Sequence, residues 1–348
     1  MKAITVEPNK AGTARLEDIP NPDVRQGSVL VETVAVGVCG TDIEIVAGMY
    51  GWAPPGRSRL VLGHESLGRV VESDSSGRLK KGDLVAGIVR RPDPVPCPNC
   101  AVGEWDMCRN GQYTEHGIKQ VDGYMSELWR IEPDYAIRLD SSLGLLGVLL
   151  EPTAVVTKAW EAVVAVGQRS LWEPRTVLVT GAGPIGLLAA LLGKERGLDV
   201  HVLDQFESGP KPDLVRALGA TYHNGPVAKI GFEPDVVIEC TGVGSIIADA
   251  IECVGSSGIV CLTGVGRGSN TRSDSRDIAT EAVLRNKVVV GSVNANKRHW
   301  YKGGQALARA NREWLSRLIS RCERPENFTD ALARKPDDIK VVIQFSEA

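Results

Sequence analysis

The sequence predicts an α/β protein in which a β-rich, loop-rich part precedes a doubly wound parallel sheet. Up to about Leu150, short β-like runs at 28–36, 68–72 and 84–89 are separated by clusters of Pro, Gly and Asp. From Arg175 onward, β-like runs alternate with helical stretches, which is typical of a parallel sheet covered by helices. We therefore expect one domain over 1–157, a second over 158–294, and a segment over 295–348 that returns to the first.

The elements of the second part follow from their local patterns. The sequence predicts strands at 176–180, 200–203, 236–240, 259–263 and 287–292, and helices from Pro184, around 212–218 and around 245–253. After Asn294 the sequence becomes charged and predicts a helix over 306–322. The apolar run at 339–344 predicts a final strand.

Length and composition favour an intracellular two-domain protein. The chain has 348 residues, of which 43% are hydrophobic and 24% charged, as in globular proteins. A net charge of -3 gives no basic field for nucleic acid. The charged N-terminus lacks a signal-peptide core, and no run suggests the roughly 18 apolar residues of a membrane span. We expect a cytoplasmic protein whose eight cysteines serve as thiols and metal ligands rather than disulfides.

A glycine-rich turn predicts a dinucleotide site. The run Gly181-Ala182-Gly183-Pro184-Ile185-Gly186 follows the strand at 176–180 and opens a helix, so a pyrophosphate would lie against the helix N-terminus. Asp204 ends the next strand, close to the ~20-residue spacing of a ribose-binding acid. Because Gln205 and Phe206 supply no arginine for a 2′-phosphate, the sequence favours NAD over NADP. Asp204 could instead be an ordinary surface acid after a buried strand.

Three closely spaced cysteines predict a structural zinc site. Cys97 and Cys100 have knuckle spacing and Cys108 follows, but four ligands are usual. Asp93 is the nearest candidate for the fourth, which gives a Cys3Asp hypothesis. A water as fourth ligand, or a site that has been lost and leaves free thiols, are the alternatives.

A second metal site is predicted from residues that are distant in the sequence. Cys39, His64, Glu65 and Glu151 offer the S, N and O ligands that zinc accepts, with a coordination position left open for a substrate hydroxyl. Glu151 directly follows an apolar run and therefore needs a partner or a metal. The competing interpretation is that Cys39 and His64 are ordinary core residues.

These motifs, in this order, resemble the zinc-dependent medium-chain dehydrogenases. Within that superfamily the chain resembles the archaeal and bacterial glucose 1-dehydrogenases along essentially its whole length. The segments that carry this finer resemblance are Val89-Arg90-Arg91-Pro92, Tyr113-Thr114-Glu115-His116-Gly117-Ile118, Asp122-Gly123-Tyr124-Met125-Ser126-Glu127 and Gly291-Ser292-Val293-Asn294.

The resemblance implies a GroES-like catalytic domain, a Rossmann domain, a homodimer or homotetramer, and oxidation of β-D-glucose and related aldoses at C1 to the lactone. It also implies that Glu115 and Asn294 contact sugar hydroxyls, with Glu151 near both metal and sugar. The chain departs from many relatives in two places. No cysteine occurs in 92–96, where the knuckle of those relatives begins, and Gln205 and Phe206 replace the arginines of NADP-using relatives.

The remaining roles concern proton and hydride transfer. Thr41 is predicted to accept a hydrogen bond from the reacting hydroxyl and to pass its proton on, although it could be only a turn residue. Thr263, Gly264 and Val265 are expected beside the nicotinamide carboxamide. The predicted cofactor-binding residues also include Thr241, Ser292 and Asn294.

Two further functions remain open from the sequence. The same mechanism could act on a polyol, a secondary alcohol or a sugar-like pathway intermediate. In a different class, the chain could be a nucleotide-binding protein without turnover, although such a protein has no need of an open zinc position.

Overall fold

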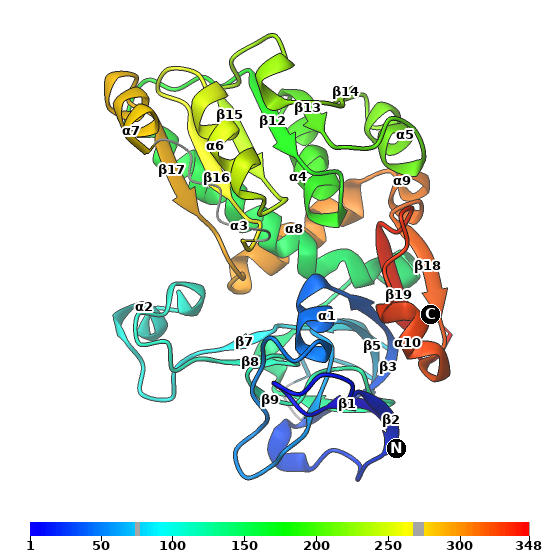
Figure 1. Ribbon diagram of the computed structural model, residues 1–348. Helices are drawn as coiled ribbons and strands as arrows, with labels where there is room; N and C mark the ends of the chain where they lie inside the picture. The colour runs from blue at the N-terminus through cyan, green and yellow to red at the C-terminus, as the bar shows by residue number, and fades with distance from the viewer. Residues whose placement is uncertain (74–76, 267–274, 348) are drawn as a thin grey trace. The chain divides into compact units, whose positions relative to one another are not determined.

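The chain forms two compact units, drawn as ribbons in Figure 1. This computed structural model describes residues 1–73, 77–266 and 275–347. Unit 1 comprises residues 1–154 and 294–348, and unit 2 comprises residues 155–293. The C-terminal segment therefore belongs to the same unit as the N-terminal part.

Unit 1 is built on a seven-stranded sheet. Strand β3 has ten residues and pairs antiparallel with β5 on one side and β19 on the other, and most of its second half is buried. The last strand, β19, runs antiparallel to β3 and pairs Val341 with Val38, next to the point where β3 ends. The order is β11 (Ala136–Arg138), β6 (Leu84–Gly87), β5 (Glu65–Glu72), β3 (Val29–Val38), β19 (Lys340–Gln344) and β18 (Ile319–Glu323), with β10 (Leu128–Ile131) also on β3.

Two small sheets and several short helices complete unit 1. One sheet has the order β2 (Arg15–Asp18), β1 (Lys2–Val6) and β4 (Leu60–Val61), and the other β7 (Arg90–Arg91), β8 (Thr114–His116) and β9 (Gln120–Val121). The helices are η1 (Val24–Gln26), α1 (Gly40–Val46), α2 (Pro98–Ala101), η2 (Trp105–Met107), η3 (Pro133–Tyr135), η4 (Ser141–Leu149), α8 (Lys297–Arg309), α9 (Arg312–Ser316), η6 (Pro325–Asn327) and α10 (Phe328–Leu332).

Unit 2 is a six-stranded parallel sheet, and it confirms the predicted fold class. Its strand order reverses direction between β12 and β15, as in doubly wound dinucleotide-binding sheets. The order is β14 (Thr221–His223), β13 (Asp199–Leu203), β12 (Thr176–Thr180), β15 (Val236–Glu239), β16 (Ile259–Leu262) and β17 (Val288–Gly291).

Helices pack on this sheet and bury its apolar side chains. Helix α4 contacts β12 and β13, and α6 contacts β15 and β16. One core cluster consists of Leu178, Leu203, Val227, Val237, Ala250, Val254 and Val260. The helices are α3 (Leu150–Gly167), which starts in unit 1, α4 (Pro184–Glu195), α5 (Pro210–Ala217), η5 (Val227–Lys229), α6 (Gly244–Cys253) and α7 (Ser275–Leu284).

The predicted helix over 306–322 is wrong. Helix α8 ends at Arg309 because Asn311 starts α9 instead, its side chain accepting a hydrogen bond from the Trp314 N–H at 2.9 Å. The remaining residues form β18, which pairs in parallel with β19 and alternates between half-buried and exposed positions. The charged residues there suggested a helix, but pairing with a distant strand outweighed that local preference.

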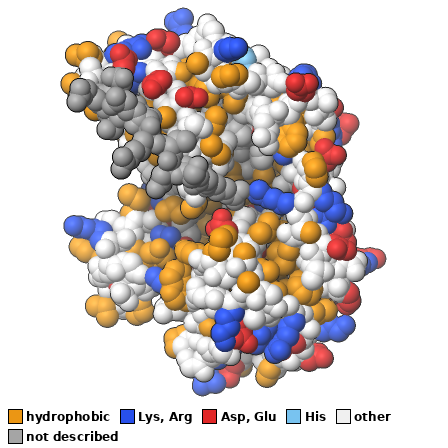
Figure 2. All heavy atoms as spheres, in the orientation of Figure 1, with side chains coloured by type: hydrophobic (Ala, Val, Ile, Leu, Met, Phe, Trp, Pro, Cys, Tyr) orange, Lys and Arg blue, Asp and Glu red, His pale blue; other side chains and the backbone are white. Residues whose placement is uncertain are grey.

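The expectation about membrane spans also needs correction. Within the described ranges, Ser141–Gly167 is long and apolar enough by length and composition to cross a membrane. However, 72% of its apolar window is buried inside the protein, which is the position of a core helix. On the face drawn in Figure 2, basic side chains are interspersed with acidic ones, in line with the net charge of -3.

Candidate functional site

Three of the four predicted catalytic ligands meet in unit 1. Cys39 lies between β3 and α1, and its N–H donates to Asp42 Oδ2 at 2.8 Å. His64 immediately precedes β5, and Glu65 is the first residue of that strand. Within the described chain, the ligand atoms of Cys39, His64 and Glu65 all lie within 4.8 Å of one another, so thiol, imidazole and carboxylate converge on one point.

The thiol, imidazole and carboxylate fit zinc, and the buried carboxylate of Asp42 lies next to the imidazole of His64. Its Oδ1 lies 3.4 Å from Nδ1 of His64, and both side chains are buried. Burial by itself lowers the pKa of His64, but Asp42 and Cys39 raise it well above its usual value. A buried carboxylate beside the imidazole of a metal ligand orients the ring and increases its basicity.

Close backbone contacts fix His64 in place. Gly63 has a φ of +88°, and the loop around β8 and β9 lies directly on its backbone. A Cβ at Gly117 or Gly123 would come within 2.4 Å of the Gly63 backbone. These glycines bring segments that are about 50 residues apart in the sequence into contact beside the imidazole.

Lys340, which sequence reasoning missed, forms a buried ion pair with Glu65. Its Nζ donates to Oε1 at 2.7 Å and to Oε2 at 2.6 Å, and also to the Val38 carbonyl at 3.2 Å. The side chains of Lys340 and Glu65 are only 2% exposed. Gly37, opposite Glu65 in the β3–β5 register, leaves room for the carboxylate, because a Cβ there would lie 2.1 Å from Oε2. A lysine in an apolar terminal strand was the signal in the sequence.

Glu151 and Thr41 lie on the helices beside this cluster. Glu151 is buried in the first turn of α3, and its carboxylate is not among the atoms that converge at the cluster. Burial raises its pKa to about 7, with His64 and Lys340 opposing and Glu65 adding to the rise. Thr41 is half-buried in the first turn of α1.

The two residues predicted to contact sugar hydroxyls lie in unit 1 and touch each other. Asn294 Nδ2 donates to Glu115 Oε1 at 2.8 Å. Glu115 is buried in β8, and Asn294 adopts a left-handed conformation with φ +61°. The structure thus places Asn294 in contact with the other sugar-binding candidate, Glu115.

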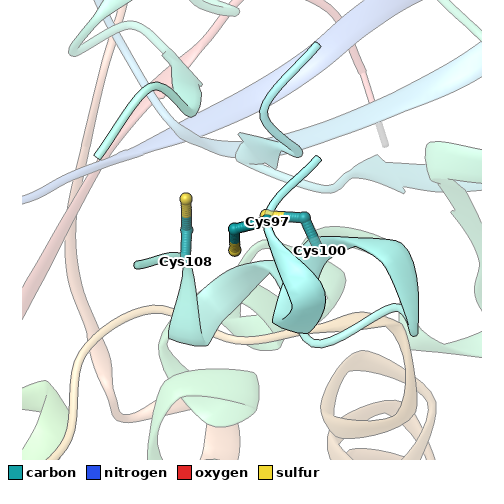
Figure 3. Close-up of side chains that lie close together, drawn as sticks. All are labelled: Cys97, Cys100 and Cys108. Atoms are coloured by element: carbon teal, nitrogen blue, oxygen red, sulfur yellow. The ribbon is translucent and has the colours of Figure 1, made fainter. Parts of the chain in front are cut away.

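The three cysteines of the second metal site also converge, as Figure 3 shows. The sulfur atoms of Cys97, Cys100 and Cys108 lie within 4.8 Å of one another. Hydrogen bonds from the N–H of Arg109 and other backbone amides lower the pKa of Cys97 to about 6, which favours its thiolate. Burial raises the pKa of Cys100 to about 11.

The structure does not bring the Asp93 carboxylate to the three sulfurs. Its Oδ1 accepts from the Val95 N–H at 2.9 Å, and its Oδ2 accepts from Asn110 Nδ2 at 2.6 Å. Its side chain is absent from the group of metal-ligating atoms found among the described residues. For a Cys3Asp site to form, the Asp93 carboxylate would have to break its hydrogen bond with Asn110 and turn toward the three sulfurs.

The glycine-rich turn in unit 2 has the geometry expected for a pyrophosphate. Gly181 has a φ of +91°, and a Cβ on Gly186 would lie 1.8 Å from the Gly181 carbonyl, so the turn requires glycine at both positions. Gly183 precedes α4 as its N-cap, Pro184 is the first helical residue and Ile185 follows, so the free N–H groups of the first turn are available to an anion.

Asp204 lies directly beside this turn. Its Oδ2 accepts from the Ala182 N–H at 2.5 Å, and its Oδ1 accepts from the N–H of the exposed Gln205 at 2.7 Å. The acid thus stands at the carboxyl ends of β12 and β13, where a ribose attached to the pyrophosphate would lie.

A buried acid that sequence reasoning missed, Glu239, orders the other predicted cofactor-binding loops. Its carboxylate accepts from the backbone N–H groups of Thr241 and Gly242, and its carbonyl accepts from the N–H groups of Thr263 and Gly264. The remaining two candidates of unit 2, Val265 and Ser292, follow β16 and β17. A lone acid at the end of the apolar run Val236–Glu239 was the available signal.

Comparisons with known proteins cover the whole chain. A family model described as "Glucose dehydrogenase C-terminus" matches residues 144–345, and one described as "Alcohol dehydrogenase GroES-like domain" matches residues 25–141. Glucose 1-dehydrogenase of Methanocella arvoryzae is 38% identical over 99% of both chains, and that of Thermoproteus tenax is 37% identical over 99% of both. The solved structure of Haloferax mediterranei glucose dehydrogenase in complex with NADP, Zn and gluconolactone is 31% identical, covers 100% of both chains and has a TM-score of 0.92.

Proposed function

Because the chain belongs to the glucose dehydrogenase family of zinc-dependent medium-chain dehydrogenases, we propose that it oxidises D-glucose and related aldoses at C1. The C1 hydrogen leaves as hydride to a nicotinamide cofactor, the C1 hydroxyl loses its proton, and the lactone forms. The observation that carries this proposal is the convergence of Cys39, His64 and Glu65 in unit 1.

In unit 1, one group of residues would bind the metal and another would bind the sugar. Cys39, His64 and Glu65 would hold zinc, and the buried carboxylate of Glu151, whose pKa is raised to about 7, would serve as a further ligand once it has lost its proton. Bound there, zinc supplies Lewis acidity that lowers the pKa of an alcohol oxygen. Thr41 accepts a hydrogen bond from the reacting hydroxyl, while Glu115 and Asn294 hold other hydroxyls of the sugar.

We propose that unit 2 binds the cofactor and prefers NAD to NADP. Gly181, Gly183 and Gly186 shape the pyrophosphate turn, and the Asp204 carboxylate accepts hydrogen bonds from the ribose hydroxyls. A 2′-phosphate beside Asp204 would be repelled, and the exposed Gln205 cannot offset its charge. The Haloferax mediterranei relative was solved with NADP, so the preference needs its own measurement.

The cluster of Cys97, Cys100 and Cys108 would hold a second, structural zinc. Three thiols at one point form a donor set that zinc accepts, and water or a reoriented Asp93 would complete it. The three cysteines lie in and around the short helices α2 and η2, so a metal there would order this loop segment.

We further propose a cytoplasmic homodimer or homotetramer. Strand β17 is the edge of the parallel sheet, pairing only with β16 among the described strands, and its Val289 is 43% exposed. An edge strand with exposed apolar side chains is suited to pairing with a second copy. Analytical ultracentrifugation of the wild type and a Val289→Lys variant tests this assembly, since the charge should favour the monomer.

The test of the function is cofactor reduction on a panel of substrates. NADH formation is followed with glucose, galactose, xylose, sorbitol and 2-butanol, before chelation, after chelation and after zinc is restored. Turnover of glucose that is lost on chelation and restored by zinc supports the proposal. Turnover restricted to sorbitol or 2-butanol would keep the mechanism but reject glucose, and NADH binding without any turnover would favour a non-catalytic role.

A further inference from the structure

Arg90, to which the reaction outlined above assigns no role, forms a buried pair with Glu115. They face each other across the antiparallel strands β7 and β8. Nε of Arg90 donates to Glu115 Oε1 at 3.0 Å, and Nη2 lies 3.0 Å from the same oxygen. The two side chains are 5% and 7% exposed, so both charges are withdrawn from water.

The rest of the Arg90 guanidinium is also occupied. Nη1 donates to the carbonyl of Asp106 at 3.1 Å, and the guanidinium carbon lies 3.7 Å from the centre of the Tyr113 ring. All three nitrogens are thus committed to protein atoms, and the ring holds the planar group from one face. Each nitrogen of the Arg90 guanidinium thus has a protein partner, which fixes the orientation of the group.

Asn294 adds a third donor to the same carboxylate oxygen. Its Oδ1 accepts from the Ala295 N–H at 2.7 Å, which orients the amide so that Nδ2 donates to Glu115 Oε1 at 2.8 Å. Three nitrogens therefore surround Oε1. No described residue donates a hydrogen bond to Oε2, which leaves that oxygen as an acceptor for a ligand.

We propose that Arg90 is a positioning residue for sugar recognition, which aims Oε2 of Glu115 at one particular hydroxyl of the substrate. This inference rests on the proposed function and identifies how its sugar site discriminates between hydroxyls. Oε2 accepts the hydrogen of the sugar hydroxyl, and the second N–H of Asn294 is available to donate to an oxygen of the same or the adjacent hydroxyl. Vicinal hydroxyls present this combination of donor and acceptor.

The contacts of Arg90 require the planar guanidinium of arginine, and the positive charge of a lysine would not be enough. The planar fork reaches Oε1 with two nitrogens and the Asp106 carbonyl with the third, whereas a lysine ammonium is a point charge that cannot fix the rotation of the carboxylate. Arg90→Lys therefore keeps the charge and loses the orientation. The neighbouring Arg91 provides a matched control, because it stacks on Tyr135 at 3.9 Å and pairs with a different carboxylate, that of Glu132, at 3.3 Å.

The experiment compares wild type, Arg90→Lys and Arg91→Lys on glucose and on its 2-, 3-, 4- and 6-deoxy analogues. A site built to bind a hydroxyl discriminates strongly against the analogue that lacks it, so one deoxy sugar should be a much poorer substrate of the wild type. In Arg90→Lys we expect kcat/KM for glucose to fall about tenfold or more, mainly through KM. For the deoxy sugar that lacks the recognised hydroxyl, kcat/KM should change little, so the variant should no longer prefer glucose to this analogue. Arg91→Lys should retain that preference, and zinc content and NADH affinity should be equal in all three proteins.

An equal loss in Arg90→Lys on glucose and on all four deoxy sugars would overturn the inference, since Arg90 would then only support the fold. A loss of zinc or NADH binding in Arg90→Lys would also overturn the inference. If Arg90→Lys does not fold, as judged by circular dichroism, Arg90→Gln replaces it, because the amide keeps an N–H donor without the fork.

Calorimetric binding of gluconolactone separates this inference from the proposed function, because it needs no turnover. Wild type that binds the lactone about tenfold more tightly than Arg90→Lys, yet oxidises no sugar, would uphold the role of Arg90 and reject the activity. Lactone binding that is the same in both proteins, or absent from the wild type, would reject the role of Arg90.

Discussion

The buried pair of Lys340 and Glu65 makes a prediction about both stability and metal binding. Lys340→Met removes the ammonium and keeps a side chain of similar length. The Glu65 carboxylate, only 2% exposed, then loses the donor that contacts both of its oxygens at 2.7 and 2.6 Å. No water can replace the ammonium without entering the interior, so the folded state carries an uncompensated charge.

The magnitude follows from the burial of the pair. Removing one partner of a buried ion pair costs about 3–5 kcal/mol, because the charge left behind remains desolvated. For a unit of about 150–250 residues this corresponds to a fall in Tm of roughly 6–20 °C. The double variant Lys340→Met/Glu65→Gln removes both charges, so we expect it to recover at least half of that loss. The exposed pair of Lys2 and Glu326, at 49% and 59% exposure, supplies the control Lys2→Met, with an expected cost of about 0–1 kcal/mol.

The same variant should bind zinc more tightly. Removing a cation from contact with one of the three converging ligands leaves Glu65 a better anionic donor, and we expect about a tenfold gain in affinity. Calorimetry of the zinc-free proteins measures stability, and competition with a chromogenic chelator measures zinc affinity without any turnover. A Lys340→Met protein that is as stable as Lys2→Met and has unchanged zinc affinity would refute the reasoning.

Three further predictions concern the cofactor, the second metal and pH. Asp204→Asn removes the charge beside the Ala182 N–H, and kinetics with both cofactors should show kcat/KM for NAD falling by about tenfold relative to NADP; an unchanged ratio would exclude Asp204 from the preference. Elemental analysis of Cys100→Ser should find one zinc per chain where the wild type holds two, and equal counts would rule out a metal at the cysteine cluster. His116 is buried with Nδ1 2.7 Å from the Asp122 carbonyl, and burial holds its pKa well below the usual value. The unfolded chain therefore binds a proton below about pH 6.5 that the folded chain does not, so stability should fall as pH drops, by up to about 1.4 kcal/mol per pH unit. Urea unfolding at pH 7.5 and 5.5 should show that His116→Gln lacks this part of the slope, and an identical slope would mean that His116 is protonated in the fold.

Local sequence was sufficient for the elements whose signals are short. The strand at Thr176–Thr180 occurs as predicted, and the glycines at 181 and 186 are needed where the turn approaches itself. Both depend on residues within about ten positions of each other. Hydrophobic alternation and glycine conformation are properties of the local chain, so they can be recognised without knowing the fold. The helix predicted over 306–322 failed because strand β18 depends on β19, which local pattern does not reveal.

The candidate ligands show the same division. The sequence by itself identified Cys39, His64 and Glu65, because thiol, imidazole and carboxylate are recognisable as metal donors wherever they occur. Their convergence, and the pairing of Glu65 with Lys340 across 275 positions, were decided by the tertiary structure. So was the burial of Glu115, one oxygen of which is held by Arg90 and Asn294. Residue chemistry is local and can be read from the chain, whereas desolvation and charge pairing depend on which distant strands the folded sheets bring together.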